Sequence, residues 1–187
     1  MSGDVTFLAW RHPRPSGHEG RCIGRTDVRV DLRKARRLAR RIHRHANRHG
    51  EPRLVCTSPL QRCRAVGQHL RRLGWRHVVD DALLEADFGT WDGLPWSQVS
   101  RAEVDAWVEN FLHHAPGGGE SLAQVLARVQ GWSPPQAGVT VVGHAGWMLA
   151  RQWLAQHGPD RPPALASQWP RPPAHGEAWS FPVRVDQ

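Results

Sequence analysis

Five side chains in this sequence of 187 residues are of the types that phosphoryl transfer needs. Arg11 and His12 stand together at the end of an apolar run, and Arg62 follows a Thr-Ser-Pro-Leu sequence. Glu85 precedes a Phe-Gly pair, and His144 closes a second apolar run. A neutral imidazole is a nucleophile, a guanidinium pairs with two phosphoryl oxygens, and a carboxyl group can protonate a leaving alkoxide. These groups together predict phosphoryl transfer through a phosphohistidine.

Strands and helices must deliver these groups to one place. Apolar runs predict strands at Val5–Trp10, Arg53–Thr57, His77–Val79 and Val139–Gly143, with an edge strand around Trp179–Val185. Helices are predicted over Arg33–Arg48, from Pro59 to about Leu73, over Ala102–His113, around Leu122–Val129 and over Ala145–His157. The segments Arg11–Asp31, Ala82–Pro95 and Pro116–Gly119 are rich in Pro or Gly and predict loops.

The alternation of strands and helices predicts an α/β fold, a three-layer sandwich with a mostly parallel central sheet flanked by helices. One domain over residues 1–187 is expected, because the length suits a single core. The sequence shows no secretory leader and no apolar run of about 20 residues, so a cytoplasmic protein is expected. Cys22, Cys56 and Cys63 lack the number and spacing of a disulfide framework or a zinc site. Cys56 and Cys63 predict small packing residues rather than a redox site.

The formal net charge is +8, and most of the excess lies between Arg33 and Arg48. Within that stretch apolar residues recur at helical spacing, at Leu32, Ala35, Leu38, Ala39, Ile42 and Ala46. This pattern favours a surface helix packed on the core, with solvated arginines. A nucleic-acid-binding arm is the alternative, but no aromatic residues interleave the charges as stacking platforms.

Five blocks of sequence, in order, resemble the motifs of the histidine phosphatase superfamily, the phosphoglycerate-mutase-like family. The blocks are Leu8–His12, Thr57–Arg62, Leu84–Gly93, Pro116–Ser121 and Val142–Gly146. Within this family the segment Gly20–Asp27 is similar to a loop of the α-ribazole phosphatases, which act in cobalamin biosynthesis. The resemblance spans residues 5 to about 150 and implies a phosphoglycerate-mutase-like fold.

The resemblance also implies a role for each residue. His12 is expected to be the nucleophile, with Arg11 and Arg62 on the phosphoryl oxygens and His144 completing the phosphate pocket. Glu85 is expected to be the general acid because it stands four residues before Gly89, where the family's acid stands. The rivals Asp87 and Asp92 are expected to make hydrogen bonds within the loop. Substrate contacts are expected from Ile23, Gly24 and Ala145. No cofactor and no metal are expected.

The sequence departs from the family pattern after the Arg-His pair. The family usually has Gly there, often followed by an acidic residue and Thr, whereas this sequence has Pro13, Arg14 and Pro15. Pro13 removes a backbone donor, and Arg14 either contacts phosphate or faces solvent. The expected function is hydrolysis of small phosphate esters, with α-ribazole phosphate as the first candidate substrate and a broad range of sugar or nucleotide phosphates as the alternative. The alternatives are a phosphoglycerate mutase and a non-catalytic, basic RNA-binding protein. No nucleic acid and no membrane is expected as a partner, and a homodimer is left open.

Overall fold

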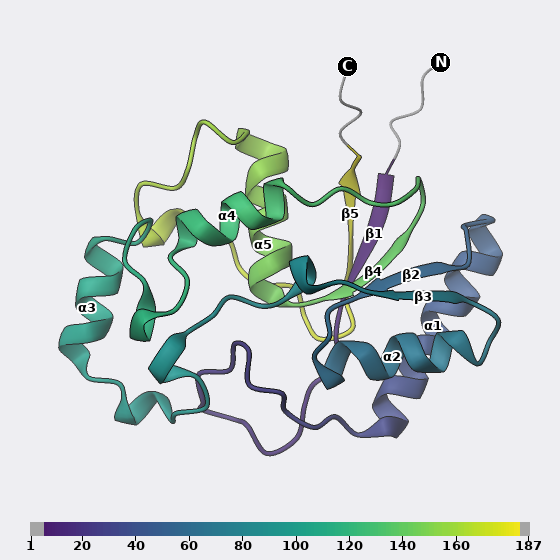
Figure 1. Ribbon diagram of the computed structural model, residues 1–187, viewed down its shortest axis with the longest axis horizontal. Helices are drawn as coiled ribbons and strands as arrows, with labels where there is room; N and C mark the ends of the chain where they lie inside the picture. Colours follow the sequence, from purple (N-terminus) through teal and green to yellow (C-terminus); the bar gives the residue numbers. More distant parts are fainter. Residues whose placement is uncertain (1–5, 184–187) are drawn as a thin grey trace.

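The computed structural model describes residues 6–183, and its centre is a five-stranded sheet of order β3-β2-β4-β1-β5 (Figure 1). Four strands run parallel and β5 runs antiparallel to β1. In chain order the strands are β1 (Thr6–Arg11), β2 (Leu54–Thr57), β3 (Arg76–Val79), β4 (Thr140–Gly143) and β5 (Ala178–Pro182). The predicted mostly parallel sheet is therefore confirmed, with β5 as its antiparallel edge.

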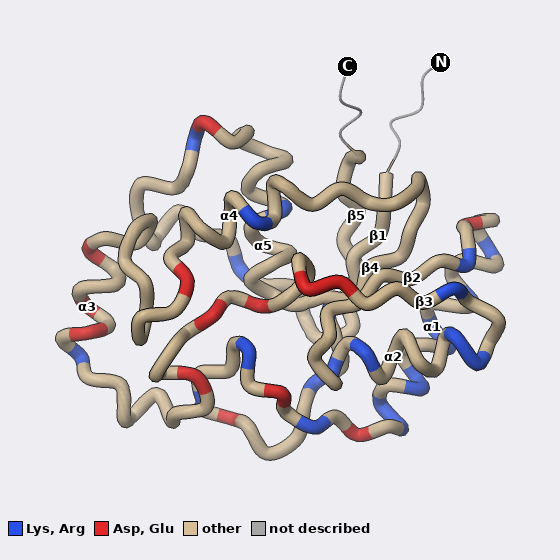
Figure 2. The backbone as a smooth tube through the Cα atoms, viewed as in Figure 1, with Lys and Arg blue, Asp and Glu red and all other residues tan. Residues whose placement is uncertain are grey.

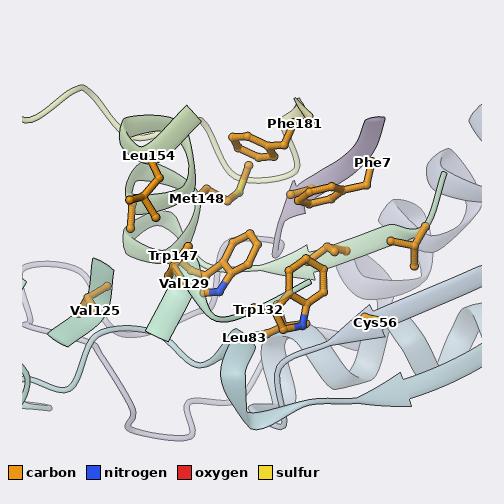
Figure 3. Close-up of a cluster of buried hydrophobic side chains, with 14 of the residues drawn as sticks. Phe7, Cys56, Leu83, Val125, Val129, Trp132, Trp147, Met148, Leu154 and Phe181 are labelled. Atoms are coloured by element: carbon orange, nitrogen blue, oxygen red, sulfur yellow. The ribbon is translucent and has the colours of Figure 1, made fainter. Parts of the chain in front are cut away.

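Helices cover both faces of this sheet, as the three-layer prediction requires. On one face lie α1 (Leu32–His49) and α2 (Gln61–Arg71), whose apolar residues pack with Trp10, Val55 and Val142. On the other lie α4 (Leu122–Gln130) and α5 (Ala145–His157), which pack with Phe7 and Cys56 (Figure 3). Alternate strand residues face opposite helical layers because side chains alternate along a strand.

A fifth helix, α3 (Arg101–Glu109), lies to one side of the sheet (Figure 1). It begins with a capping box between Ser100 and Glu103. Its residues Val104 and Trp107 pack on a satellite cluster of Cys22, Trp91 and Val99 rather than on the main core.

The structure corrects several predicted boundaries. The helix α3 ends at Glu109 rather than His113, because Asn110 leaves the helical region at φ −119° and ψ 54°. Pro59 stands before α2, which starts at Gln61 after the N-cap Leu60. Val5 and Val185, at the ends of two predicted strands, lie outside the described residues.

The Arg-rich segment forms α1, as predicted. Asp31 caps its first turn, and Gly50 ends it in the left-handed conformation. The five residues buried from α1 are Ala35, Leu38, Ala39, Ile42 and Ala46, whereas Leu32, placed on the same stripe from the sequence, is 64% exposed. Lys and Arg gather along α1 and α2 (Figure 2). Within residues 6–183 no helix is both long and apolar enough to cross a bilayer.

The carboxyl ends of β1, β2 and β4 meet at one edge of the sheet. Arg11 pairs with Gly143, and Thr57 pairs with Val142. Residues that directly follow these strands therefore lie close together, which is where ligands bind in parallel α/β sheets.

Candidate functional site

His12 directly follows β1, and its backbone N–H donates to the carbonyl of Gly143 at 3.0 Å. Its ring Nδ1 lies 2.9 Å from the carbonyl oxygen of Pro13. Since a carbonyl only accepts hydrogen bonds, Nδ1 must carry the proton, and Nε2 keeps a free lone pair. Burial lowers the pKa of His12 well below its usual value, and the positive charges of Arg62 and Arg11 lower it further. The ring is therefore a neutral imidazole near pH 7.

Arg62 lies in the first turn of α2 and is 1% exposed. Its Nη2 donates to the carbonyl of Gly24 at 2.6 Å, and its Nη1 donates to the carbonyl of Thr26 at 2.9 Å. Three bonds from one planar guanidinium leave it little freedom to rotate, and the third bond goes to His144. Arg62 thus presents a fixed positive charge to the cavity that it lines.

Arg11, the last residue of β1, lines the same cavity. Its Nη1 donates to the carbonyl of Pro173 at 2.6 Å. Its Nε is buried and has no hydrogen-bond partner among the described residues. A buried donor without a partner is costly, so Nε is suited to an anion that enters the cavity. Burial lowers the pKa of Arg11, which Glu85 partly offsets.

Glu85 follows the turn Asp81–Leu83 and is 8% exposed. Its Oε2 accepts from the backbone N–H of Gly146 at 3.1 Å, and its Oε1 accepts from its neighbour Ala86 at 3.0 Å. A Cβ at residue 146 would lie 2.3 Å from Oε1. The start of α5 thus approaches the carboxylate closely because residue 146 is glycine.

His144 is fully buried and lies behind the cavity rather than on its lining. Arg62 Nε donates to its Nδ1 at 3.3 Å, so the neutral ring carries its proton on Nε2, which lies 3.4 Å from the sulfur of Cys63. Burial and the charge of Arg62 lower the pKa of His144 well below its usual value. The ring centroids of His144 and His12 are 5.1 Å apart. His144 is not among the side chains that line the cavity but bonds to Arg62, which does, so its expected part in completing the phosphate pocket stays a prediction.

The three residues expected to contact substrate have different positions. Ile23 and Ala145 line the cavity, but Gly24 does not. The N–H of Gly24 donates to Asp92 at 3.1 Å, and its carbonyl accepts from Arg62. Gly24 therefore helps to place Arg62, and both of its backbone polar groups are already bonded within the protein.

The loop carboxylates behave as expected for structural groups. Asp92 accepts from the backbone N–H of Thr26 at 3.0 Å and from its hydroxyl at 2.7 Å, as well as from Gly24 and Arg25. Asp87 accepts from the N–H of Gly89 at 2.8 Å. Arg14 lines the cavity with an exposed side chain.

Sequence reasoning missed Glu120 and Arg128, which hold the segment of Glu85. Arg128 donates from Nη1 to the carbonyls of Ala82 and Leu84 at 3.0 and 2.8 Å. It also forms a bidentate pair with Glu120 through bonds of 3.0 and 2.9 Å. Burial alone would raise the pKa of Glu120, but Arg128 and the N–H of Asp87 hold it below its usual value.

Sequence reasoning also missed His175, which lies between α5 and β5 and lines the cavity. Its ring centroid is 5.2 Å from that of His12. Its Nδ1 is buried and has no hydrogen-bond partner within residues 6–183. Burial and the charges of Arg11 and Arg14 lower the pKa of His175 to about 4. The only signal in the sequence was that residue 175 is a histidine, because no family motif surrounds it.

The cavity has a volume of about 760 Å³. Arg11, His12, Arg62 and Glu85 all line it, so four of the five predicted residues converge on it and His144 supports them. The arrangement places a nucleophilic nitrogen beside two guanidiniums and a carboxyl group. Among the described residues, no group of three or more His, Cys, Asp or Glu side chains could hold a metal ion.

Comparisons with known proteins identify the family and the fold. The sequence profile of the histidine phosphatase superfamily (branch 1) matches residues 7–167. A bifunctional protein of Mycobacterium tuberculosis strain H37Rv is 38% identical over 80 residues, which are 41% of this chain. That match spans only 22% of the length of the curated relative.

Two solved structures have the same fold. The mycobacterial glucosyl-3-phosphoglycerate phosphatase is 23% identical, with a TM-score of 0.72 over 94% of this chain and 89% of its own. The α-ribazole phosphatase from Shigella flexneri is 20% identical, with a TM-score of 0.71 over 96% of this chain and 95% of its own. The predicted α/β architecture is thereby confirmed.

Proposed function

Since the chain belongs to the histidine phosphatase superfamily, we propose that it hydrolyses small phosphate monoesters through a phosphohistidine on His12. The observation that carries the proposal is the hydrogen bond from His12 Nδ1 to the carbonyl of Pro13. That bond leaves Nε2 as the nucleophile, in a ring that burial keeps neutral.

In the first step Nε2 of His12 attacks phosphorus, and the bond between phosphorus and the ester oxygen breaks. Glu85 gives its proton to the leaving oxygen, so that an alcohol departs rather than an alkoxide. The guanidiniums of Arg11 and Arg62 stabilise the negative charge that builds on the equatorial phosphoryl oxygens. One of these oxygens can accept a hydrogen bond from the unpartnered Nε of Arg11.

In the second step water attacks the phosphohistidine, and the Glu85 carboxylate takes the proton of that water. The bond between nitrogen and phosphorus breaks, inorganic phosphate forms, and His12 returns to its neutral state. One carboxyl group serves as acid and then as base, which requires the fixed position given by the N–H groups of Ala86 and Gly146.

For the natural substrate, α-ribazole phosphate is our first candidate. Its support is the loop Gly20–Asp27, similar to the corresponding loop of α-ribazole phosphatases, and the shared fold with the enzyme from Shigella flexneri. The loop contributes Gly20, Arg21 and Ile23 to the cavity lining.

The test is His12→Ala, assayed for phosphate release from p-nitrophenyl phosphate in the presence of EDTA. We expect a loss of at least about 1,000-fold, because the covalent route is removed. His113→Ala is the control, because His113 is exposed and does not line the cavity. Brief reaction of the wild-type protein with a ³²P-labelled ester should give acid-labile, base-stable label on His12. Label on serine, or full activity of His12→Ala, contradicts the proposal.

A further inference from the structure

The cavity continues away from His12 along a row of aromatic side chains. Five of them line it, and we call these the aromatic wall: Phe88, Trp96, Trp107, Phe111 and Trp169. Trp107 belongs to α3, so the cavity extends from the edge of the sheet toward that helix. The aliphatic side chains of Leu122, Val125 and Leu149 also line this space.

Four of the five rings of the aromatic wall form a chain of contacts. Trp107 lies between Phe88, at a centroid distance of 6.1 Å, and Phe111, at 5.9 Å. Phe111 continues to Trp169 at 6.0 Å. These spacings lie within the range in which aromatic pairs attract.

Buried rings hold the aromatic wall from behind. Trp91, which is 2% exposed, contacts Trp96 at 6.5 Å and Trp107 at 5.9 Å. The Nε1 of Trp91 donates to Glu103 at 3.2 Å, which fixes its ring. Trp153 packs on Trp169 at 5.8 Å. The aromatic wall is therefore a preorganised apolar surface rather than a set of loose side chains.

The aromatic end of this cavity lacks the neutral amide and hydroxyl side chains that usually bind a ligand rich in hydroxyl groups. No Asn, Gln, Asp, Ser or Thr stands among its described lining residues. Glu85 is assigned to proton transfer, and Glu120 is already bonded to Arg25 and Arg128. Arg14, His18, Glu19, Arg21 and His175 also line the cavity, so hydroxyl groups have partners elsewhere in it, whereas the aromatic wall offers them only indole N–H donors.

We propose that the aromatic wall binds a flat aromatic or heteroaromatic ring in the alcohol part of the substrate, while His12 and its guanidiniums hold the phosphate. This assignment rests on the proposed phosphatase function. The volume of about 760 Å³ accommodates both parts at once, and one continuous lining joins the charged end to the aromatic end.

The test compares kcat/KM for 2-phenylethyl phosphate and butyl phosphate. Both are esters of primary alcohols, so the chemical step is alike and the ring is the difference. We expect a preference of about tenfold or more for the phenyl ester. Trp96→Ala should reduce this ratio toward one, and because Trp96 is 42% exposed its loss is compatible with folding. Val108→Ala, an exposed position on the same helix as Trp107, is the control that keeps the ratio.

Equal kcat/KM for the two esters, or a preference for ribose 5-phosphate over the phenyl ester, overturns the inference while the phosphatase function stands. If neither these esters nor p-nitrophenyl phosphate is hydrolysed, the phosphatase proposal fails, and calorimetric titration with 2-phenylethylphosphonate and butylphosphonate decides the inference by itself. Tighter binding of the phenyl compound supports the aromatic wall, and equal or undetectable binding overturns it.

Discussion

The carbonyl of Pro13 determines which nitrogen of His12 is free to react. The family usually has glycine at this position, and proline lacks the backbone donor that glycine has. What residue 13 contributes here is its carbonyl, an acceptor that proline retains. The departure from the family pattern at residue 13 therefore keeps the acceptor that leaves Nε2 of His12, the proposed nucleophile, free.

Replacing Gly146 with alanine should lower the catalytic rate without lowering the stability of the fold. The added Cβ would lie 2.3 Å from Glu85 Oε1, so the carboxylate must move, whereas alanine suits a helix better than glycine does. We expect kcat for 2-phenylethyl phosphate to fall about 100-fold, with a smaller fall for p-nitrophenyl phosphate, whose leaving group needs no proton. Urea unfolding should show no loss of stability.

The matched control is Gly131→Ala at the end of α4, where the nearest atom to the new Cβ is 3.6 Å away. Its activity on both esters should equal that of the wild type. If kcat of Gly146→Ala on 2-phenylethyl phosphate equals that of the wild type, Gly146 does not position Glu85 for proton transfer.

Between β3 and α3 the chain carries Glu85 on an irregular segment whose position depends on a neighbouring helix. Arg128 of α4 donates to the carbonyls of Ala82 and Leu84, and its side chain and that of Glu120 are 18% and 17% exposed. A helix thereby fixes a loop whose own regular hydrogen bonds are confined to short 3-10 turns.

Arg128→Met should therefore weaken both the fold and the reaction. We expect a loss of about 2 kcal/mol in the free energy of unfolding, because Glu120 loses its bidentate partner and two carbonyls lose their donor. If Arg128 acts through Glu85, kcat should fall more for 2-phenylethyl phosphate than for p-nitrophenyl phosphate.

Arg101→Met provides the comparison, since the pair of Arg101 with Asp105 is 94% and 60% exposed. Its unfolding free energy should stay within about 0.5 kcal/mol of the wild type. Equal effects of Arg128→Met on the two esters would identify a purely structural role.

The sequence predicted the elements whose signal is local. His12 and His144 could be placed because each closes an apolar strand, and the α1 helix could be placed from its apolar stripe. Arg128 and His175 could not, because their partners lie far away along the chain: Arg128 contacts a carbonyl 46 residues earlier, and the ring of His175 packs on that of His12. The end of α3 was missed because residues 110–113 continue the helical pattern in sequence but not in backbone conformation.

Taken as a whole, the molecule buries neutral histidines close to arginines, which makes its stability sensitive to acid. The pKa values of His12, His144 and His175 are all lowered in the fold. In the unfolded chain these rings bind protons near pH 6.5, so acidification below that pH favours unfolding.

Urea unfolding at pH 7.5 and at pH 5.5 should reveal this difference. A histidine that is neutral in the fold but protonated in the unfolded chain lowers the free energy of unfolding by up to about 1.4 kcal/mol for each pH unit below 6.5. For the two most buried rings, His12 and His144, we expect a combined loss of up to about 3 kcal/mol at pH 5.5. A free energy of unfolding that is equal or larger at pH 5.5 would contradict the assigned neutral states.

The segment after α5 passes the cavity before it joins the sheet as β5. There Pro173 accepts from Arg11, His175 packs on His12, and β5 pairs with the outer side of β1. During translation the ribosome makes these residues after every other group of the site. Until they emerge, the nascent chain has an uncovered strand edge and an incomplete pocket, so the pocket can be completed only after residues 173–182 have been made.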